Sequence, residues 1–104
     1  MVAAWIARDA ASAAACFAPK GVYRERAGEP IAGTDALCRH FAAFFSAAGT
    51  WDFHIDEVIE RGDRAAVFYR FRTKGADDAW SERAGCAAVW MRDGLIDLWR
   101  EYTG

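Results

Sequence analysis

The stretch TDALCRHFAAFFSAAGTWDFHID, residues 34–56, contains the change of hydrophobic period that decides the fold class. Its first part repeats apolar residues at helical spacing: Leu37, Phe41, Phe44, Phe45 and Ala48. This single apolar face predicts an amphipathic helix, with Thr34 as its cap and Asp35 in its first turn. Apolar and polar residues then alternate from Trp51 to Asp56. The change from a period of about 3.6 to about 2 predicts a half-buried strand directly after the helix.

The flanking sequence extends this pattern in both directions. Upstream, residues 2–18 favour helix with a break near Asp9, which caps a second short helix over 10–18 that ends before Pro19. A short strand over 21–28 and an extended return over 31–33 follow. Downstream, the alternation predicts three further strands, over residues 65–73, 80–91 and 95–102. Helices followed by clustered antiparallel strands predict an α+β protein, with the helices on the concave face of a curved sheet.

Composition indicates one globular domain with few special demands. The chain has 104 residues, 54% of them apolar and 27% charged, which is typical of a globular chain. Its 23 alanines, the 11 arginines among 13 basic residues and the lack of Asn and Gln indicate a GC-rich bacterial genome. The net charge is −2 and the basic residues are scattered, so nothing predicts binding to nucleic acid or to an anionic membrane. No uncharged stretch approaches the roughly 20 residues that span a bilayer.

The cysteines and histidines favour a cytoplasmic protein without a metal. Cys16, Cys38 and Cys86 are odd in number and far apart, which excludes a disulfide framework and a local zinc site. Reduced, half-buried thiols are the simplest interpretation. His40 and His54 fall in different predicted elements. We therefore expect no metal site. The N-terminal segment lacks the positive region of a secretion signal, so we expect a cytoplasmic location.

Three stretches of the chain carry a resemblance to a known superfamily. They are CFAPKGVY (16–23), IAGTDAL (31–37) and RDGLI (92–96) followed by WREY (99–102). The order of the elements and these joints resemble the NTF2-like superfamily, in particular its small SnoaL-like and ketosteroid-isomerase-like proteins. The resemblance covers nearly all of residues 1–104 and implies a single cone-shaped α+β domain, a homodimer, and a small, mostly apolar ligand. The superfamily includes isomerases, epoxide hydrolases and polyketide cyclases, so the fold alone does not select a reaction.

The ketosteroid-isomerase resemblance implies a catalytic carboxylate at Glu25. In those enzymes a carboxylate on the first strand moves a proton between carbon atoms. Their oxyanion-hole tyrosine and acid would fall at Met1 and Ala87, where no donor stands. One such donor is worth about 10²–10³ in turnover, so steroid isomerisation by that mechanism is disfavoured. From the residues alone, Glu25 between Arg24 and Arg26 fits either an exposed charged cluster or a base in a pocket.

The limonene-type epoxide hydrolase resemblance implies a second carboxylate. These enzymes use two acids bridged by an arginine, and the matching positions are Glu101, Arg70 and, in place of the second acid, Arg72. A cation at the position of the base breaks that mechanism as written. Arg70 and Arg72 share one strand face, while Tyr69 and Phe71 share the other. If the arginine face points inward, Glu101 and Arg70 form a pair inside the cone that is either structural or catalytic.

The ligand-binding residues are expected among the aromatics. We expect the ligand to contact Phe41, Phe45, Phe53, Arg72 and Trp99. Trp80 and Trp90 lie on a small-residue face that suits either a sheet-to-sheet dimer contact or a ligand cavity.

Two functional hypotheses follow. The first is an isomerase, hydrolase or cyclase without a cofactor, in which Glu25 or Glu101 is the base and Arg70 its electrostatic partner. The second is a non-catalytic ligand-binding or dimerisation module whose interior is filled by its own aromatics.

Overall fold

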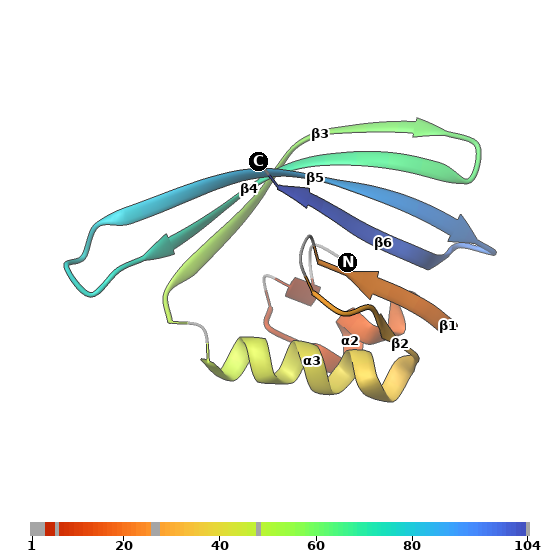
Figure 1. Ribbon diagram of the computed structural model, residues 1–104, viewed down its shortest axis with the longest axis horizontal. Helices are drawn as coiled ribbons and strands as arrows, with labels where there is room; N and C mark the ends of the chain where they lie inside the picture. The colour runs from red at the N-terminus through yellow and green to blue at the C-terminus, as the bar shows by residue number, and fades with distance from the viewer. Residues whose placement is uncertain (1–3, 6, 26–27, 48, 104) are drawn as a thin grey trace.

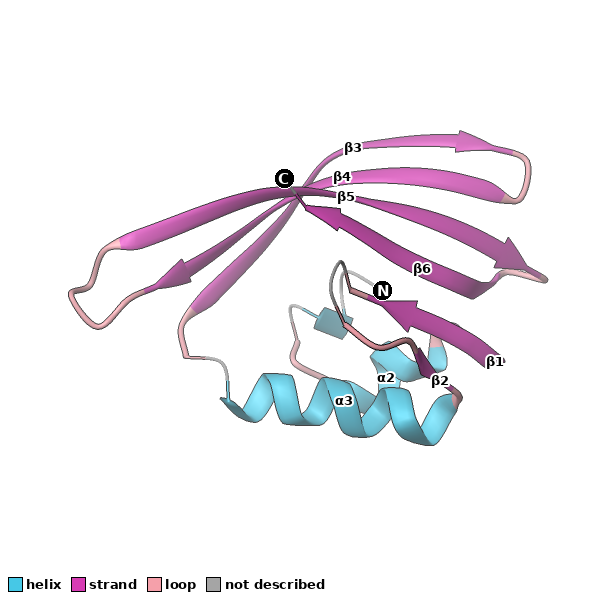
Figure 2. Cartoon of the chain, viewed as in Figure 1, coloured by secondary structure: helices cyan, strands magenta, loops and turns pink. Residues whose placement is uncertain are grey.

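A six-stranded sheet curves over two helices (Figure 1, Figure 2). The structure is a computed structural model and describes residues 4–5, 7–25, 28–47 and 49–103. The elements after residue 9 run α2(Ala10–Ala15), β1(Phe17–Arg24), β2(Ile31–Ala32), α3(Thr34–Ala47), β3(Trp51–Arg61), β4(Arg64–Lys74), β5(Trp80–Arg92) and β6(Leu95–Thr103). Figure 1 shows α2 and α3 on the same side of the sheet. The expected α+β class, with helices laid on a curved sheet, is confirmed.

The sheet joins the two ends of the chain. Its strand order is β2-β1-β6-β5-β4-β3, and every neighbouring pair is antiparallel except β1 with β6, which is parallel. The parallel pair places Tyr23 opposite Trp99. The first and last strands therefore lie side by side in the middle of the sheet, although they are far apart in the sequence.

The helix predicted over 34–48 forms because its apolar face has a core to cover. Leu37 and Phe41 are fully buried at 0% exposure, and Asp35 lies in the first turn of α3 as expected. Gly33, with a φ of +91°, precedes the helix, and its carbonyl accepts from the N–H of Leu37 at 3.0 Å. Thr34 is thus the first helical residue rather than the cap. The predicted last residue of the apolar face, Ala48, lies outside the described residues.

The predicted helix over 10–18 is too long. Asp9 caps it as expected, accepting from the Ser12 N–H at 3.1 Å, but α2 ends at Ala15. Phe17 already belongs to β1, where it pairs with Ile96, and the Ile96 N–H donates to the Cys16 carbonyl at 2.8 Å. Burial of the Phe17 ring in the core outweighs the helix propensity of the alanine-rich segment.

The structure shows which strand faces meet the helices. Val67 and Tyr69 of β4 are buried on the inner face, while Arg70 and Arg72 lie on the outer face with Phe68. The inner face and the helices together bury one core, whose largest members are Phe17, Tyr23, Leu37, Phe41, Val67, Tyr69, Val89, Ile96 and Trp99. The question of strand facing, which the sequence leaves open, is answered by these contacts.

The substitution Gly21→Ala should destabilise the parallel pair of β1 and β6. A Cβ at Gly21 would lie 2.7 Å from the backbone oxygen of Ile96 and 3.0 Å from that of Ala18, so backbone must move. We expect a loss of about 1–3 kcal/mol in the free energy of unfolding, measured by urea denaturation. Gly49→Ala is the matched control, because a Cβ there meets nothing within 4 Å. Equal stability of the two variants would contradict the tight approach at Gly21.

Candidate functional site

A carboxylate held by two buried tyrosines lies on the inner face of the sheet. The phenol of Tyr23 donates a hydrogen bond to Oε1 of Glu101, and the phenol of Tyr69 donates to Oε2 at 2.6 Å. Tyr23 is 3% exposed and Tyr69 is 4% exposed, whereas Glu101 keeps an intermediate exposure. Both oxygens act as acceptors, which is the pattern of an ionised carboxylate with one side still accessible.

Small residues on β5 let these side chains meet. Tyr23 comes from β1, Glu101 from β6 and Tyr69 from β4, and β5 separates the last two. Opposite them, β5 carries Gly85 next to Tyr69 and Ala87 next to Glu101. A Cβ at Gly85 would lie 2.6 Å from Cζ of Tyr69, so the ring passes directly over the glycine. The phenol reaches Glu101 because β5 leaves this space empty.

Burial keeps both phenols protonated. The pKa of Tyr23 is raised well above its ordinary value, first by burial and then by the negative charge of Glu101. The pKa of Tyr69 is raised in the same way, first by burial and then by its hydrogen bond to Glu101. Both side chains are therefore permanent hydrogen-bond donors to the carboxylate near neutral pH.

Glu25 lies outside this cluster, just beyond the end of β1. Its Oε1 is 3.2 Å from Nε2 of His40, which is on α3, and the Glu25 side chain is 50% exposed. The His40 ring packs on Tyr23 with ring centroids 5.4 Å apart. The structure therefore brings Glu25 close to Tyr23 through His40 but leaves its carboxylate open to solvent.

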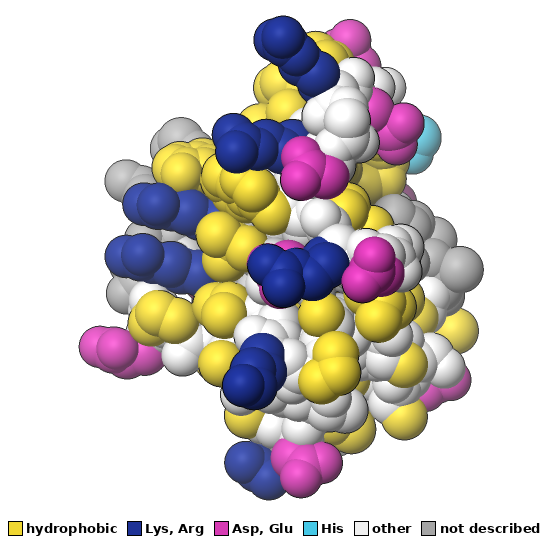
Figure 3. Space-filling view, turned by 90° about the vertical axis from the view of Figure 1, so that its right-hand side faces the viewer, with side chains coloured by type: hydrophobic (Ala, Val, Ile, Leu, Met, Phe, Trp, Pro, Cys, Tyr) yellow, Lys and Arg dark blue, Asp and Glu magenta, His cyan; other side chains and the backbone are white. Residues whose placement is uncertain are grey.

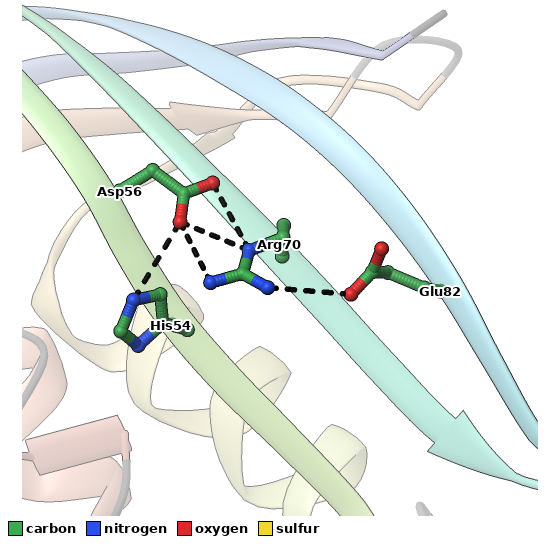
Figure 4. Close-up of polar contacts among 4 residues, drawn as sticks. All are labelled: His54, Asp56, Arg70 and Glu82. Atoms are coloured by element: carbon green, nitrogen blue, oxygen red, sulfur yellow. Dashed lines mark hydrogen bonds and ion pairs between the residues drawn. The ribbon is translucent and has the colours of Figure 1, made fainter.

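Arg70 does not reach Glu101. Its guanidinium lies on the outer face and contacts Asp56, with both Nε and Nη2 at 2.9 Å from Oδ1 (Figure 4). A longer contact of 3.7 Å joins Nη1 of Arg70 to Oε1 of Glu82 on β5. Nε2 of His54 lies 3.5 Å from Oδ1 of Asp56. The arginine face points outward, so the pairing of Glu101 with Arg70 inside the cone is not formed. The two tyrosines occupy its place.

The remaining candidate residues fall into two groups. Phe41 and Trp99 are buried in the core, and Phe53 stacks near Tyr69 with ring centroids 5.2 Å apart. Phe45, near the C-terminal end of α3, packs against Trp51. Arg72 lies on the outer face, where its guanidinium is 4.6 Å from the ring centroid of Trp80. The four aromatics thus face the interior, and Arg72 does not.

Trp5 is the centre of an aromatic cluster near the C-terminal end of α3. Its ring lies 5.2 Å from Phe45, 5.5 Å from Phe41 and 6.1 Å from Trp51, between ring centroids. The indole N–H groups of Trp5 and Trp51 are buried without an acceptor in the described part of the chain. The cluster holds no carboxylate, so acid–base chemistry in the interior depends on the Glu101 end.

Sequence reasoning missed Tyr23 and Tyr69 as partners of Glu101. In the sequence, Tyr23 is only the last residue of the stretch 16–23 that carries the resemblance, and Tyr69 only lies on the strand face opposite Arg70 and Arg72. One signal was present: residues 84–88 of this strand are all small, and Gly85 and Ala87 are two of them. The partner of Glu101 was sought among cations, whereas the structure supplies two neutral donors.

A separate cleft of about 420 Å³ opens beside two hairpin turns. It is lined by Asp63, Trp90, Met91, Arg92, Asp93 and Asp97. None of the candidate catalytic residues borders it, and its one cation, Arg92, already lies 3.7 Å from Asp97. Among the described residues, no group of three or more His, Cys, Asp or Glu side chains is placed to hold a metal ion. No described helix has the length and apolar character to cross a bilayer.

Comparison with known families gives one match. The model of the SnoaL-like domain matches residues 1–99. A search of the curated proteins found no match.

Solved structures with the same fold are numerous but distant in sequence. A protein of ketosteroid-isomerase-like fold from Catenulispora acidiphila, in complex with trimethylamine, has a TM-score of 0.85 at 19% identity over 96% of this chain and 78% of its own. An LEH-like epoxide hydrolase from M. tuberculosis has a TM-score of 0.80 at 17% identity, over 98% of this chain and 75% of its own. A putative polyketide cyclase from Sinorhizobium meliloti has a TM-score of 0.80 at 22% identity, over 96% of this chain and 87% of its own. At these identities the likeness shows the fold alone, and it confirms the expected NTF2-like architecture.

The raised pKa values of the two tyrosines predict a loss of stability at alkaline pH. Their contribution is complete below about pH 10, the ordinary tyrosine value, and declines above it because only the unfolded chain releases the proton. Each tyrosine should make the free energy of unfolding fall more steeply, by about 1.4 kcal/mol per pH unit. Urea denaturation at several pH values should show a shallower decline for Tyr69→Phe than for the wild type.

Tyr102→Phe is the control, because Tyr102 is 48% exposed and none of the hydrogen bonds described here involves it. Its alkaline profile should follow that of the wild type. A Tyr69→Phe profile identical to both would contradict the raised pKa of the buried phenol.

Proposed function

The chain belongs to the SnoaL-like domain family, and we propose that its interior binds a small, mostly apolar molecule whose polar group meets Glu101. One observation carries this proposal. Glu101 is partly exposed, while two buried phenols hold both of its oxygens on the inner face. A carboxylate fixed in this way is oriented before any ligand arrives, which is what acid–base chemistry in a closed site needs.

Glu101 is the proposed base of an isomerase, hydrolase or cyclase that needs no cofactor. It accepts a proton from the bound molecule, and Tyr23 and Tyr69 keep the carboxylate in place while its charge changes. The proposed apolar wall is Phe53, which is half-buried beside Tyr69, whereas Phe41 and Trp99 belong to the packed core. Arg70 has no part in this step, because its guanidinium is engaged with Asp56 on the outer face.

Glu25 is the second proposed base. The ketosteroid-isomerase resemblance places it at the base position, and His40 orients its carboxylate from α3. The negative charge of Glu25 acts on the pKa of Tyr23 in the same direction as that of Glu101. A bound molecule near Tyr23 thus has a carboxylate on either side, one inside the cone and one at its edge.

The neighbours are compatible with a small ligand. Trimethylamine is present in the Catenulispora acidiphila structure, and polyporic acid in the structure of TerC, whose TM-score is 0.84 at 18% identity. These molecules differ in charge and size, so they support a small ligand in this fold and not one reaction.

A non-catalytic ligand-binding or dimerisation module is the second candidate function. It is favoured by the aromatic cluster around Trp5, which fills one end of the interior with the chain's own side chains. On the face shown in Figure 3, basic side chains are interspersed with acidic and apolar ones. We propose no nucleic-acid or membrane partner for either candidate function.

We further propose a cytoplasmic homodimer of single domains spanning 1–104. The outer face of the sheet exposes Ile59 at 53%, Phe68 at 37% and Trp80 at 45%. Phe68 is on β4 and Trp80 is on the neighbouring strand β5, so these side chains belong to adjacent strands of one surface. A second copy packed on this surface would remove these apolar side chains from water.

Glu101→Gln should separate the two functions. In a thermal-shift screen with epoxides, steroids and aromatic polyketides, we expect at least one class to raise the wild-type melting temperature. With that class as substrate, Glu101→Gln should lower turnover by about 100-fold or more, because the base is lost. Glu60→Gln, which removes an exposed glutamate from β3, is the matched control. Binding without a rate difference between the two variants would leave the module and exclude catalysis by Glu101.

Light scattering tests the dimer. At micromolar concentration we expect a mass twice that of one chain, and Phe68→Glu should reduce it to the mass of one chain because a charge then lies in the contact. Lys20→Glu, at an exposed position on β1, is the control and should remain dimeric. A monomeric wild type would refute the homodimer.

A further inference from the structure

We propose that the ligand of the Glu101 site is an organic cation, a small amine with apolar substituents that carries its positive charge at neutral pH. This inference deepens the proposed function and depends on it, because it names the chemical class of the molecule that the interior binds. It follows from the charges and the ring faces that surround the carboxylate.

The negative charge of Glu101 has no counter-charge in the described part of the chain. Its two partners, Tyr23 and Tyr69, are neutral donors, and neither hydrogen bond cancels the charge. The ion pairs formed by described Lys, Arg and His side chains all involve other carboxylates. A partly buried charge is stabilised by a nearby opposite charge, and a cationic ligand would supply one at Glu101.

The other charges around the site reinforce its sign. Glu25 adds a second negative charge that acts on the Tyr23 phenol, and His40 is already in contact with Glu25. Arg83, on β5, acts in the opposite sense on Tyr69, as the weakest of the effects on that phenol. The carboxylates that act on the two phenols thus outweigh the one cation that does, which favours a cationic ligand over an anionic one.

Aromatic rings pack against the two phenols that hold the carboxylate. The ring of Tyr23 packs against Phe41 with centroids 5.2 Å apart, and the ring of Tyr69 packs against Phe53 at 5.2 Å. Trp99 lies two residues before Glu101 on the inner face and is 6% exposed. Aromatic faces attract an ammonium group through their negative quadrupole, and their apolar area suits its alkyl or aryl substituents. A carboxylate among such rings is a site for an apolar amine.

A charge series of one molecular shape tests the inference. The probes are benzylamine, benzyl alcohol and phenylacetate, which share a phenylmethyl group and are respectively cationic, neutral and anionic at pH 7. Their dissociation constants are measured by NMR titration of the isotope-labelled wild-type protein at constant ionic strength. We expect benzylamine to bind at least tenfold more tightly than benzyl alcohol, and phenylacetate to bind most weakly.

Variants locate the effect at the carboxylate. In Glu101→Gln the advantage of benzylamine over benzyl alcohol should disappear, whereas Glu60→Gln should retain it. Tyr69→Phe removes a hydrogen bond but keeps the charge, so the advantage should persist there as well. The wild-type series and Tyr69→Phe still test the inference if Glu101→Gln fails to fold.

The outcomes distinguish failure of the cation inference from failure of the proposed small-molecule site. If benzyl alcohol binds as tightly as benzylamine, or if Glu101→Gln keeps the preference, the cation inference is overturned and the proposed small-molecule site stands. If none of the three probes shifts the resonances of Tyr23, Tyr69 or Trp99, both the ligand class and the proposed site are overturned.

Discussion

The hydrogen bonds from Tyr23 and Tyr69 to Glu101 are the interaction on which the interior depends. A charged group on the inner face of a sheet needs donors of its own, because the core around it offers none. The two phenols come from strands on either side of β6 and thereby hold β1 and β4 to the same point. The strand order, the small residues of β5 and the accessible edge of the carboxylate all follow from this requirement.

Much of the architecture could be predicted because it depends on local patterns. The apolar face of α3 and the alternation in β3 are repeated signals within short windows. The end of α2 could not be predicted, because alanine favours helix while Phe17 is recruited by Ile96 from the far end of the chain. Local propensity thus held wherever no distant strand competed with it.

The site was harder to predict than the fold. Glu101 and Trp99 were expected in the site and lie on the inner face, whereas the facing of Arg70 stayed open, and the structure places it on the outer face. Parity shows that Tyr69 and Arg70 point in opposite directions without showing which is inside. Only the packing of α3 against Tyr23, and of Phe53 against Tyr69, decides that.

The parallel pairing of β1 with β6 also has a consequence for how the protein is made. Tyr23 and Glu101 are separated by 78 positions, so their contact requires almost the whole chain. During synthesis on the ribosome, α2, α3 and the β3–β4 hairpin can form from segments that are already available. The inner face of β1 must wait for the last strand to leave the exit tunnel. Until then β1 has only the two-residue strand β2 beside it, and its other edge remains unpaired.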